Sequence, residues 1–326
     1  MPANLPPQYF EAEKRYRQAR SIEEKIEALE AMLSIMPRHK GTDRLHAELR
    51  TKLAKLSAEA ERRPAIGRRG SLLYQVKREG AGQVALVGLP NVGKSSLLAC
   101  LTEATPEIAD YPFTTQTPIP GMMKLENIQI QLVDLPPITN QSAHSWLANI
   151  LRQADLLLIM IDSGNESVNQ VEAVLAELER MGIKPVGRGQ EEGMVQGVRQ
   201  KRALLGGNKS DLGKSAEALI SKYGERFPVF SVSAKEGVGL EALKKGIYEA
   251  LNIIRVYTKA PNREPDLEEP VILKRGSTVE DVAESIHKDF RSKLKYALVW
   301  GSGKFSGQRV KREHILEDGD IVELHL

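Results

Sequence analysis

The chain has 326 residues, of which 41% are hydrophobic and 27% charged, as in a folded globular protein of two or three domains. Its single cysteine, Cys100, excludes an internal disulfide framework, and no cluster of metal-binding side chains is visible. The longest apolar run, 156–161, is too short to cross a membrane, the first residues carry no signal segment, and a net charge of +3 does not by itself indicate nucleic-acid binding, so we expect a cytoplasmic protein without membrane contact.

Residues 1–70 are expected to form a helical module and a basic linker. Two apolar stripes at helical spacing consist of Ile22, Ile26, Leu29, Leu33 and Met36, and of Leu45, Leu49, Leu53 and Leu56. The break between them carries Arg38, His39 and Lys40, and the linker carries Arg62, Arg63, Arg68 and Arg69. The pattern predicts a helical hairpin whose basic side chains are either simply solvated or in contact with RNA or the ribosome.

A second domain is expected at residues 82–260, where the apolar run 84–87 leads into a glycine-rich loop. The loop has the pattern G-x-x-x-x-G-K-S, and its residues are Gly88, Leu89, Pro90, Asn91, Val92, Gly93, Lys94 and Ser95, with Ser96 in the helix that follows. Glycine lets backbone N–H groups turn around a polyphosphate, Lys94 brings positive charge to the outer phosphates, and the Ser95 hydroxyl can bind Mg²⁺. The loop therefore predicts a phosphate-binding site at a helix N-terminus.

Strands and helices alternate through the rest of this domain, which predicts an α/β fold with a mostly parallel sheet and helices on both faces. The expected strands are 84–87, 128–133, 156–161, 203–205 and 229–232, and the clearest helices are 168–181 and 240–251. Residues 187–202 show no clear period. We expect them to form a mobile surface loop beside the base of a bound nucleotide.

Polar motifs follow three of these strands, at the edge where an open α/β sheet binds ligands. Asp134 can hold Mg²⁺, usually through water. In Asn208-Lys209-Ser210-Asp211 the carboxylate of Asp211 can accept from the ring N–H and the amine of guanine, and Lys209 can lie over the base. Ser233-Ala234-Lys235 can supply a backbone donor to the guanine carbonyl. The expected ligands are therefore GTP or GDP with Mg²⁺.

Two further stretches carry a resemblance to a known family. Tyr111-Pro112-Phe113-Thr114-Thr115-Gln116-Thr117-Pro118 and the following Ile119-Pro120-Gly121 resemble the switch region of the Obg-related GTPases, in particular the developmentally regulated GTP-binding (DRG) branch. Residues 270–281 and 296–301 resemble the TGS domain of that branch. The resemblance implies GTP hydrolysis, a link to the ribosome or translation, and nucleotide contacts from Phe113, Thr114 and Thr115, with Thr115 binding Mg²⁺ when the third phosphate is present.

The resemblance also implies that residues 268–326 form a ubiquitin-like β-grasp domain, and the residue pattern agrees. Strands are expected at 271–274, 296–300 and 321–324, with an amphipathic helix at 279–290. We place the domain boundary at 262–269, which is rich in proline and acidic residues. Basic and aromatic side chains interleave here, namely Arg291, Lys293, Lys295, Tyr296, Lys304, Phe305, Arg309, Lys311 and Arg312. They form either an RNA-contacting surface or an ordinary solvated face.

The chain departs from the usual GTPase pattern after Asp134. The third motif is normally D-x-x-G, but here it is Asp134-Leu135-Pro136-Pro137, and Pro137 has no N–H for the terminal phosphate. By hypothesis, the third phosphate is sensed through the Ile138 N–H, through Thr115, or only weakly. Alternatively, a neighbouring amide takes over and nothing changes.

A second departure concerns the water-orienting glutamine of small signalling GTPases, whose place is taken by Ile138. Asn91 offers another route, because an asparagine at this position helps to bind K⁺ in several cation-dependent GTPases; it can equally cap the loop.

The sequence therefore predicts a GTPase of slow intrinsic turnover that works by electrostatic positioning. Lys94, Thr115 and Asn91 are the candidate catalytic residues, and Ser95, Thr115 and Asp134 the candidate Mg²⁺ ligands. Two alternatives stay open: a regulatory guanine-nucleotide-binding protein that hydrolyses little, and an RNA-binding adaptor.

Overall fold

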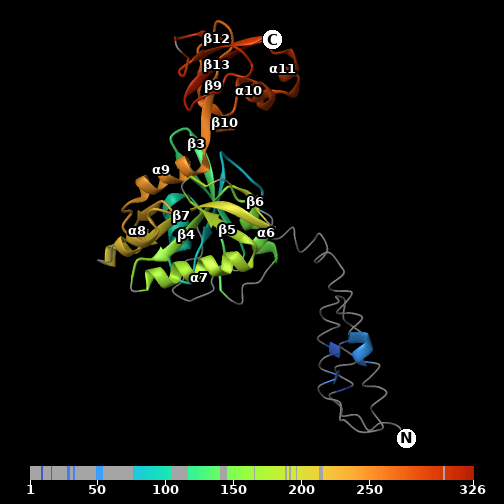
Figure 1. The fold of residues 1–326 in the computed structure, drawn as a ribbon, viewed down its shortest axis with the longest axis vertical. Coiled ribbons are helices and arrows are strands. Elements are labelled where there is room, and N and C mark those ends of the chain that lie inside the picture. Colours follow the sequence, from blue (N-terminus) through green and yellow to red (C-terminus); the bar gives the residue numbers. More distant parts are fainter. Residues whose placement is uncertain are drawn as a thin grey trace. The chain divides into compact units, whose positions relative to one another are not determined.

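The computed structural model describes most of the chain from residue 76 onward and a few helical stretches before it. The described residues are 76–103, 117–139, 145–164, 166–187, 189–190, 192–195, 197–212, 216–303 and 305–326, with 9, 16, 28–29, 32–33 and 49–53. The chain divides into two compact units, Met1–Leu73 and Tyr74–Leu326, and the second contains two sheets (Figure 1). None of the helices in the described part of the chain has the length and apolar character needed to cross a membrane.

The described residues of the first unit are helical and share a small core. Tyr9, Leu29, Met32 and Leu49 are buried, and Tyr16, Leu33 and Leu53 pack against them. All four leucines of this core come from the two apolar stripes of the sequence, so the stripes do face a common core. The predicted basic loop at 37–41 and the basic linker at 62–70 lie outside the described residues.

The first sheet of the second unit has eight strands and is mostly parallel, as expected. Its order is β2-β3-β1-β4-β7-β5, with β6 and β8 also paired to β7. The strands are β1 Gln83–Val87, β2 Ile119–Leu125, β3 Ile128–Asp134, β4 Leu156–Asp162, β5 Ile183–Val186, β6 Gly193–Val195, β7 Val198–Asn208 and β8 Val229–Ser231. Only the pairs β2–β3 and β6–β7 are antiparallel.

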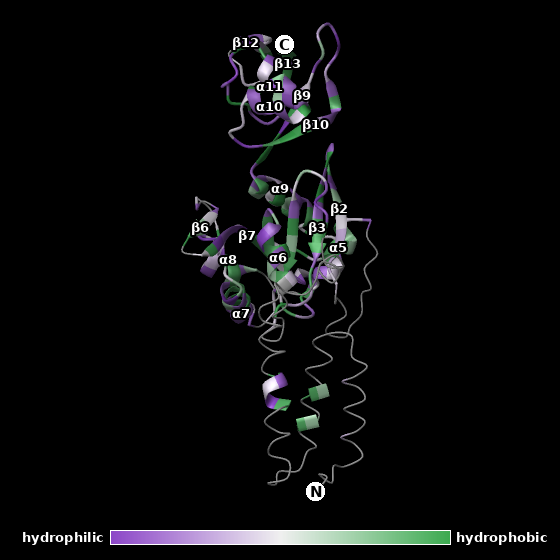
Figure 2. Cartoon of the chain, turned by 90° about the vertical axis from the view of Figure 1, so that its right-hand side faces the viewer, coloured by the Kyte–Doolittle hydropathy of each residue, from purple (hydrophilic) through white to green (hydrophobic). Residues whose placement is uncertain are grey.

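Helices cover both faces of this sheet and make three layers (Figure 1). They are α5 Lys94–Leu101, α6 Ser145–Gln153, α7 Ser167–Arg180, α8 Glu217–Tyr223 and α9 Leu240–Leu251, with a 3₁₀ turn at Ser210–Leu212. Successive residues of β1 point to opposite faces, so Val84 packs with α5 and α9, and Ala85 with α6, α7 and α8. Figure 2 shows hydrophobic residues concentrated in the strands. Burial on both faces explains why the central strands are continuous apolar runs.

The second sheet has five strands, in the order β10-β9-β13-β11-β12. The strands are β9 Ile253–Thr258, β10 Asp266–Lys274, β11 Tyr296–Trp300, β12 Gln308–Val310 and β13 Asp320–His325. The helix predicted at 279–290 is two helices, α10 Val279–Ile286 and α11 Lys288–Lys293. The break lies at His287, which is extended and accepts a hydrogen bond from the Asp289 N–H at the start of α11. Val279, Val282 and Ala283 of α10 fill the core below the sheet.

The change from the first sheet to the second lies earlier than the boundary we placed at 262–269. Residues 253–258, assigned by the sequence to the first domain, form β9 and pair with β10 and β13 of the second sheet. Ile254 and Val256 are buried there, alternating with more exposed side chains. The junction is a single residue, Asn252, which ends α9 in the left-handed conformation at φ 53°.

Residues 187–202 also differ from the expectation of an irregular loop beside the base. The described part forms β6 and the first half of β7, an antiparallel pair with Met194 opposite Arg199. The motif residue Asn208 is at the other end of β7, eight residues or about 26 Å of extended chain beyond Gln200, the last residue of that strand in the hairpin. The hairpin therefore lies away from the edge of the sheet at which the predicted nucleotide motifs lie.

Gly187, directly after β5, offers a test of the packing at this end of the sheet. A Cβ there would lie 1.5 Å from the carbonyl oxygen of Arg226. Because that atom is backbone, Gly187→Ala should lower the free energy of unfolding by about 1–3 kcal/mol, measured by urea denaturation. Gly193→Ala is the matched control, since its Cβ meets nothing within 4 Å. Equal stability of the two variants would contradict the packing described here.

Candidate nucleotide site

The loop between β1 and α5 uses glycine for packing as well as for ligand access. A Cβ on Gly88 would lie 2.4 Å from the carbonyl oxygen of Met160 in β4, and one on Gly93 would lie 2.2 Å from Nδ2 of Asn208. Gly93 also has φ 88°, a conformation that other residues avoid. The neighbouring strands thus fix this loop from beneath, with the start of α5 directly after it.

Lys94 is the buried cation of this loop. The residue is only 6% exposed. Its Nζ donates to the carbonyl oxygens of Gly88 (3.2 Å) and Leu89 (3.1 Å). Burial lowers the pKa of Lys94 to about 8, and the nearby carboxylate of Asp134 only partly opposes this. The charge is therefore poorly compensated by the protein, and an anion in the loop would stabilise it.

Ser95 and Asp134 meet at the mouth of the loop. The Ser95 hydroxyl donates to Oδ2 of Asp134 at 2.5 Å, and Asp134 is fully buried at the end of β3. Hard oxygen donors of this kind suit Mg²⁺. Among the described residues no group of three or more His, Cys, Asp or Glu could hold a metal, so Mg²⁺ here would depend on this pair and on oxygens of a bound nucleotide.

Asn208, at the end of β7, joins two neighbouring loops. Its Nδ2 donates to the carbonyl oxygen of Val92 in the glycine-rich loop (2.9 Å), and its Oδ1 accepts from the N–H of Ala234 (3.0 Å). The residue is 3% exposed. Asn208 therefore holds the phosphate loop and the 233–235 loop in one arrangement.

Asp211 is oriented by the same loop. The buried Ser233 donates its hydroxyl to Oδ1 of Asp211 at 2.6 Å and accepts from the N–H of Glu236 at 3.1 Å. The second carboxylate oxygen of Asp211 is not used in this contact. Ser233, Ala234 and Asp211, predicted to surround the base, do lie together, while the Lys235 side chain is 79% exposed.

Asp162 is a site residue that the sequence analysis missed. The ammonium group of Lys209 lies 2.8 Å from Oδ2 of Asp162, the last residue of β4. Lys209 has φ 66°, which turns its backbone at the end of β7. In the sequence, Asp162 directly follows the apolar run 156–161, just as Asp134 follows the run 128–133. That position could have indicated a residue at the same edge of the sheet.

Ile138 does not present a free N–H to a terminal phosphate. Its N–H donates to the carbonyl oxygen of Gly88 at 3.1 Å, and its side chain is fully buried in the core beside α6. Of the three hypotheses for sensing the third phosphate, the one that uses this amide conflicts with the observed bond. Sensing through Thr115 and weak sensing stay open.

The remaining predicted residues divide into two groups. Asn91 is exposed and has φ 60°, a conformation that asparagine tolerates well, so the backbone alone can account for its presence. Phe113, Thr114 and Thr115 lie outside the described residues.

The described site residues gather at the carboxyl ends of neighbouring parallel strands: Gly88 after β1, Asp134 at the end of β3, Asp162 of β4, Asn208 of β7 and Ser233 after β8. This is the edge at which open α/β sheets bind ligands. One half of the edge offers a cation and oxygen ligands for phosphates, and the other offers a carboxylate for a base.

Comparisons with known proteins agree with this reading. Residues 83–189 match the family model described as 50S ribosome-binding GTPase, and residues 254–326 match the TGS domain. Among solved structures, NFeoB from S. thermophilus bound to GDP.AlF4⁻ and K⁺ is 21% identical, with a TM-score of 0.39, over 52% of this chain and 62% of that one. Likeness at this level is weak, and the assignment depends on the sequence relatives.

Those relatives are similar along nearly the whole chain. An uncharacterised GTP-binding protein of Methanocaldococcus jannaschii is 32% identical over 93% of this chain and 92% of its own. GTP-binding protein 1 of Schizosaccharomyces pombe is 30% identical (92% and 98%), and developmentally-regulated GTP-binding protein 2 of Homo sapiens 28% identical (93% and 99%). The first alignment runs over 367 positions, more than the 326 residues here, so that relative has residues without a counterpart in this chain. The chain therefore belongs to the developmentally regulated GTP-binding branch of the Obg-related GTPases, and it is a GTP-binding protein with a GTPase domain and a TGS domain.

Proposed function

We propose that this protein hydrolyses GTP to GDP and phosphate as a Mg²⁺-dependent switch in the cytoplasm, with slow intrinsic turnover. One observation carries the proposal: Lys94, the Ser95–Asp134 pair and Asp211 lie along one sheet edge, and Asn208 joins the glycine-rich loop to the 233–235 loop, whose Ser233 holds Asp211. A phosphate chain at Lys94 and a guanine at Asp211 would then belong to a single ligand.

The residues of the chain would act by positioning charge. Backbone N–H groups of the glycine-rich loop and the Lys94 ammonium would bind the phosphates and stabilise the charge that develops on them. Ser95 and Thr115 would hold Mg²⁺, with Asp134 behind them, and the bound ion would supply further positive charge at the phosphate oxygens. No side chain need act as a strong general base.

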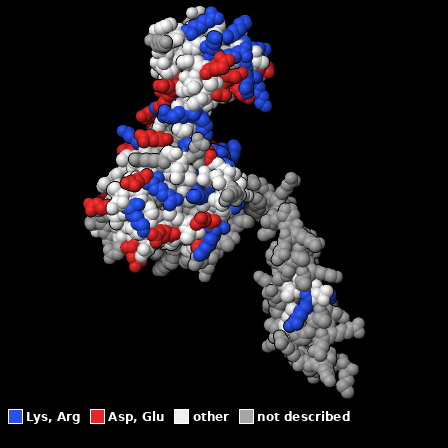
Figure 3. All heavy atoms as spheres, viewed as in Figure 1, with Lys and Arg blue, Asp and Glu red and all other residues white. Residues whose placement is uncertain are grey.

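A link to the ribosome or RNA is the broader part of the proposal. It is supported by the printed description of the matched GTPase family and by the Lys and Arg side chains of the TGS domain, which Figure 3 shows beside acidic ones. Some of these cations already have partners: Arg291 pairs with Glu280 and Glu284, and Arg309 lies 3.8 Å from the ring centroid of Tyr296. Lys293, Lys311 and Arg312 are the better candidates for phosphate contacts.

A second function is favoured by the bond from Ile138 to Gly88. The segment after Asp134 is attached to the glycine-rich loop by this bond, and Pro137 has no N–H to donate. The protein could then hold guanine nucleotides as a regulatory binding module and hydrolyse little. The third candidate, an RNA-binding adaptor, would keep its RNA affinity after Lys94→Ala and lose it steeply with salt.

Single-turnover GTP hydrolysis in K⁺ and in Na⁺ buffer tests the catalytic proposal. We expect slow hydrolysis that K⁺ accelerates by about tenfold or more, because a cation at the phosphates can replace an arginine finger. Lys94→Ala is the blank and should abolish hydrolysis. GTP binding without cleavage in either salt would favour the regulatory binding module.

Asn91→Gly separates the two explanations of Asn91. Glycine adopts φ 60° without strain, so this variant keeps the loop conformation and removes only the side chain. Loss of the K⁺ effect would identify Asn91 as an ion ligand. A K⁺ effect that survives would leave Asn91 with the local backbone role alone.

Asp211→Asn tests the assignment of the base. Guanine offers two donors to a carboxylate, whereas xanthine has a carbonyl in place of the amine, which an Asn amide can match. We expect GDP affinity to fall by about 10- to 100-fold, as for the loss of a charged hydrogen bond, and xanthosine diphosphate affinity to rise. Glu236→Gln, a neutralised neighbour in the next loop, should change neither affinity. Unchanged GDP binding by Asp211→Asn would remove Asp211 from the site.

The lowered pKa of Lys94 predicts proton uptake on binding. Below pH 8 the Lys94 amine is already protonated in the free protein. Between pH 8 and the ordinary lysine pKa near 10.5 the buried amine is mostly neutral, and bound phosphates would favour its protonated form. Calorimetry of GDP binding at pH 8.5, in two buffers with different ionisation heats, should show uptake of up to about one proton, and little at pH 7. Lys184→Met, which removes an exposed lysine of β5 outside the site, should keep the uptake. No uptake at pH 8.5 would contradict phosphate contact at Lys94.

A further inference from the structure

The turn between β2 and β3 lies at the far end of a hairpin whose other end is part of the nucleotide site. The two strands form seven residue pairs, from Ile119 opposite Asp134 to Leu125 opposite Ile128, a ladder about 20 Å long. The predicted switch residues immediately precede β2, and Asp134 ends β3. The turn itself is only Glu126 and Asn127, with Glu126 at φ 51°.

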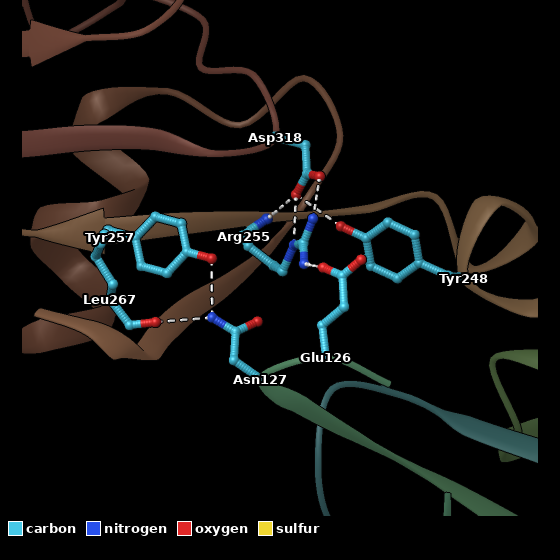
Figure 4. Close-up of polar contacts among 7 residues, drawn as sticks. All are labelled: Glu126, Asn127, Tyr248, Arg255, Tyr257, Leu267 and Asp318. Atoms are coloured by element: carbon cyan, nitrogen blue, oxygen red, sulfur yellow. Dashed lines mark hydrogen bonds and ion pairs between the residues drawn. The ribbon is translucent and has the colours of Figure 1, made fainter. Parts of the chain in front are cut away.

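Both turn residues contact the TGS domain (Figure 4). The Glu126 carboxylate accepts from Nη1 of Arg255 in β9. The Asn127 amide donates to the Tyr257 hydroxyl at 2.8 Å and to the carbonyl oxygen of Leu267 at 2.9 Å. Oδ1 of Asn127 is buried and has no hydrogen-bond partner among the described residues. The turn is therefore joined to two strands of the second sheet by side-chain hydrogen bonds.

Arg255 is oriented for this contact by Asp318 of its own domain, which is also bonded to Tyr248 of the GTPase domain. Asp318 accepts from its Nη2 (2.9 Å), its Nε (3.1 Å) and its backbone N–H (2.7 Å), which fixes the guanidinium plane. Tyr248 of α9 donates its hydroxyl to the same carboxylate at 2.6 Å, and its ring lies 5.2 Å from the guanidinium. Arg255 is only 17% exposed at its side chain, while Glu126 is 66% exposed.

These contacts hold one guanidinium between two carboxylates. Although burial opposes ionisation of Asp318, hydrogen bonds from Arg255 and Tyr248 lower its pKa to about 2, so it stays charged at neutral pH. Asp318 therefore keeps its hydrogen bonds to Arg255 available at neutral pH. The pair with the mostly exposed Glu126 is weak and can open and close at little cost. A strong bond within one domain and a weak one across the junction form a contact that can respond to movement of the hairpin.

We propose that the Glu126–Asn127 turn transmits the nucleotide state of the GTPase domain to the TGS domain through Arg255. Movement at Asp134 and at the residues before Ile119 shifts the paired strands as one body, and the shift reaches β9, β10 and the Asp318 loop. The proposal rests on nucleotide binding and does not depend on GTP hydrolysis.

Hydrogen exchange of the full chain, with GDP and with a non-hydrolysable GTP analogue, tests this coupling. We expect exchange to differ by about twofold or more between the two nucleotides both in the glycine-rich loop and in β9, β10 and residues 317–320. In Arg255→Met the difference should persist in the loop and fall in the TGS segments to the part that the Asn127 hydrogen bonds carry. Arg275→Met, which removes an exposed arginine after β10, should behave as the unchanged protein.

Glu126→Gly gives a second variant, because glycine keeps φ 51° and only the carboxylate is lost. It should reduce the TGS response while Asn127 retains part of it. A nucleotide-dependent difference confined to the GTPase domain of the unchanged protein, or a TGS response that is undiminished in Arg255→Met, would overturn the proposal. If neither nucleotide protects the glycine-rich loop, nucleotide binding itself fails, whereas absent hydrolysis alone leaves the coupling intact.

Discussion

The buried carboxamide of Asn208 is the interaction on which the nucleotide edge depends. It is the point at which the glycine-rich loop, the end of β7 and the 233–235 loop meet, and it satisfies the carbonyl of Val92 and the N–H of Ala234 at once. Each of these backbone groups, if left buried without a partner, would cost about 1–3 kcal/mol. Gly93 has no Cβ where the amide lies. The glycine of the phosphate loop and the asparagine of the base motif are therefore parts of one packing solution.

The same loop is held from a second side by Ile138. Its N–H bond to Gly88 and its buried side chain attach the segment after Asp134 to the phosphate loop. In the usual motif a glycine at the position of Pro137 would keep an N–H available for the terminal phosphate. Here Pro137 has no N–H, and the N–H of Ile138 is already bonded to Gly88. Neither amide is therefore available to a terminal phosphate in this arrangement. Of the hypotheses for sensing a third phosphate, sensing through Thr115 and weak sensing stay open.

Local motifs made much of the site predictable, since glycine-rich loops and strand-end carboxylates need particular residues at fixed spacing. In this way the motifs placed Lys94, Ser95, Asp134 and Asp211 at one edge of the sheet, which is where they lie. Asp162 was missed because a single aspartate after a strand has no motif. β9 was missed because only Asn252 separates it from α9. The hydrophobic period changes there from that of a helix to that of a strand, without a linker that composition could reveal.

The contacts of Arg255 could not be predicted at all, for a physical reason. Glu126, Arg255 and Asp318 are brought together by two separate sheets, and no spacing along the chain relates them. Beside the one-residue junction at Asn252, Ile253 and Ile272 pack against the core of the first sheet, whereas the contacts of the hairpin turn with the second sheet are polar. An extensive apolar interface would hold the domains in one arrangement, since buried hydrophobic area is lost only as a whole. Polar contacts made by a hairpin that ends at Asp134, a proposed Mg²⁺ ligand, can instead change one at a time, as the proposed coupling of the two domains requires.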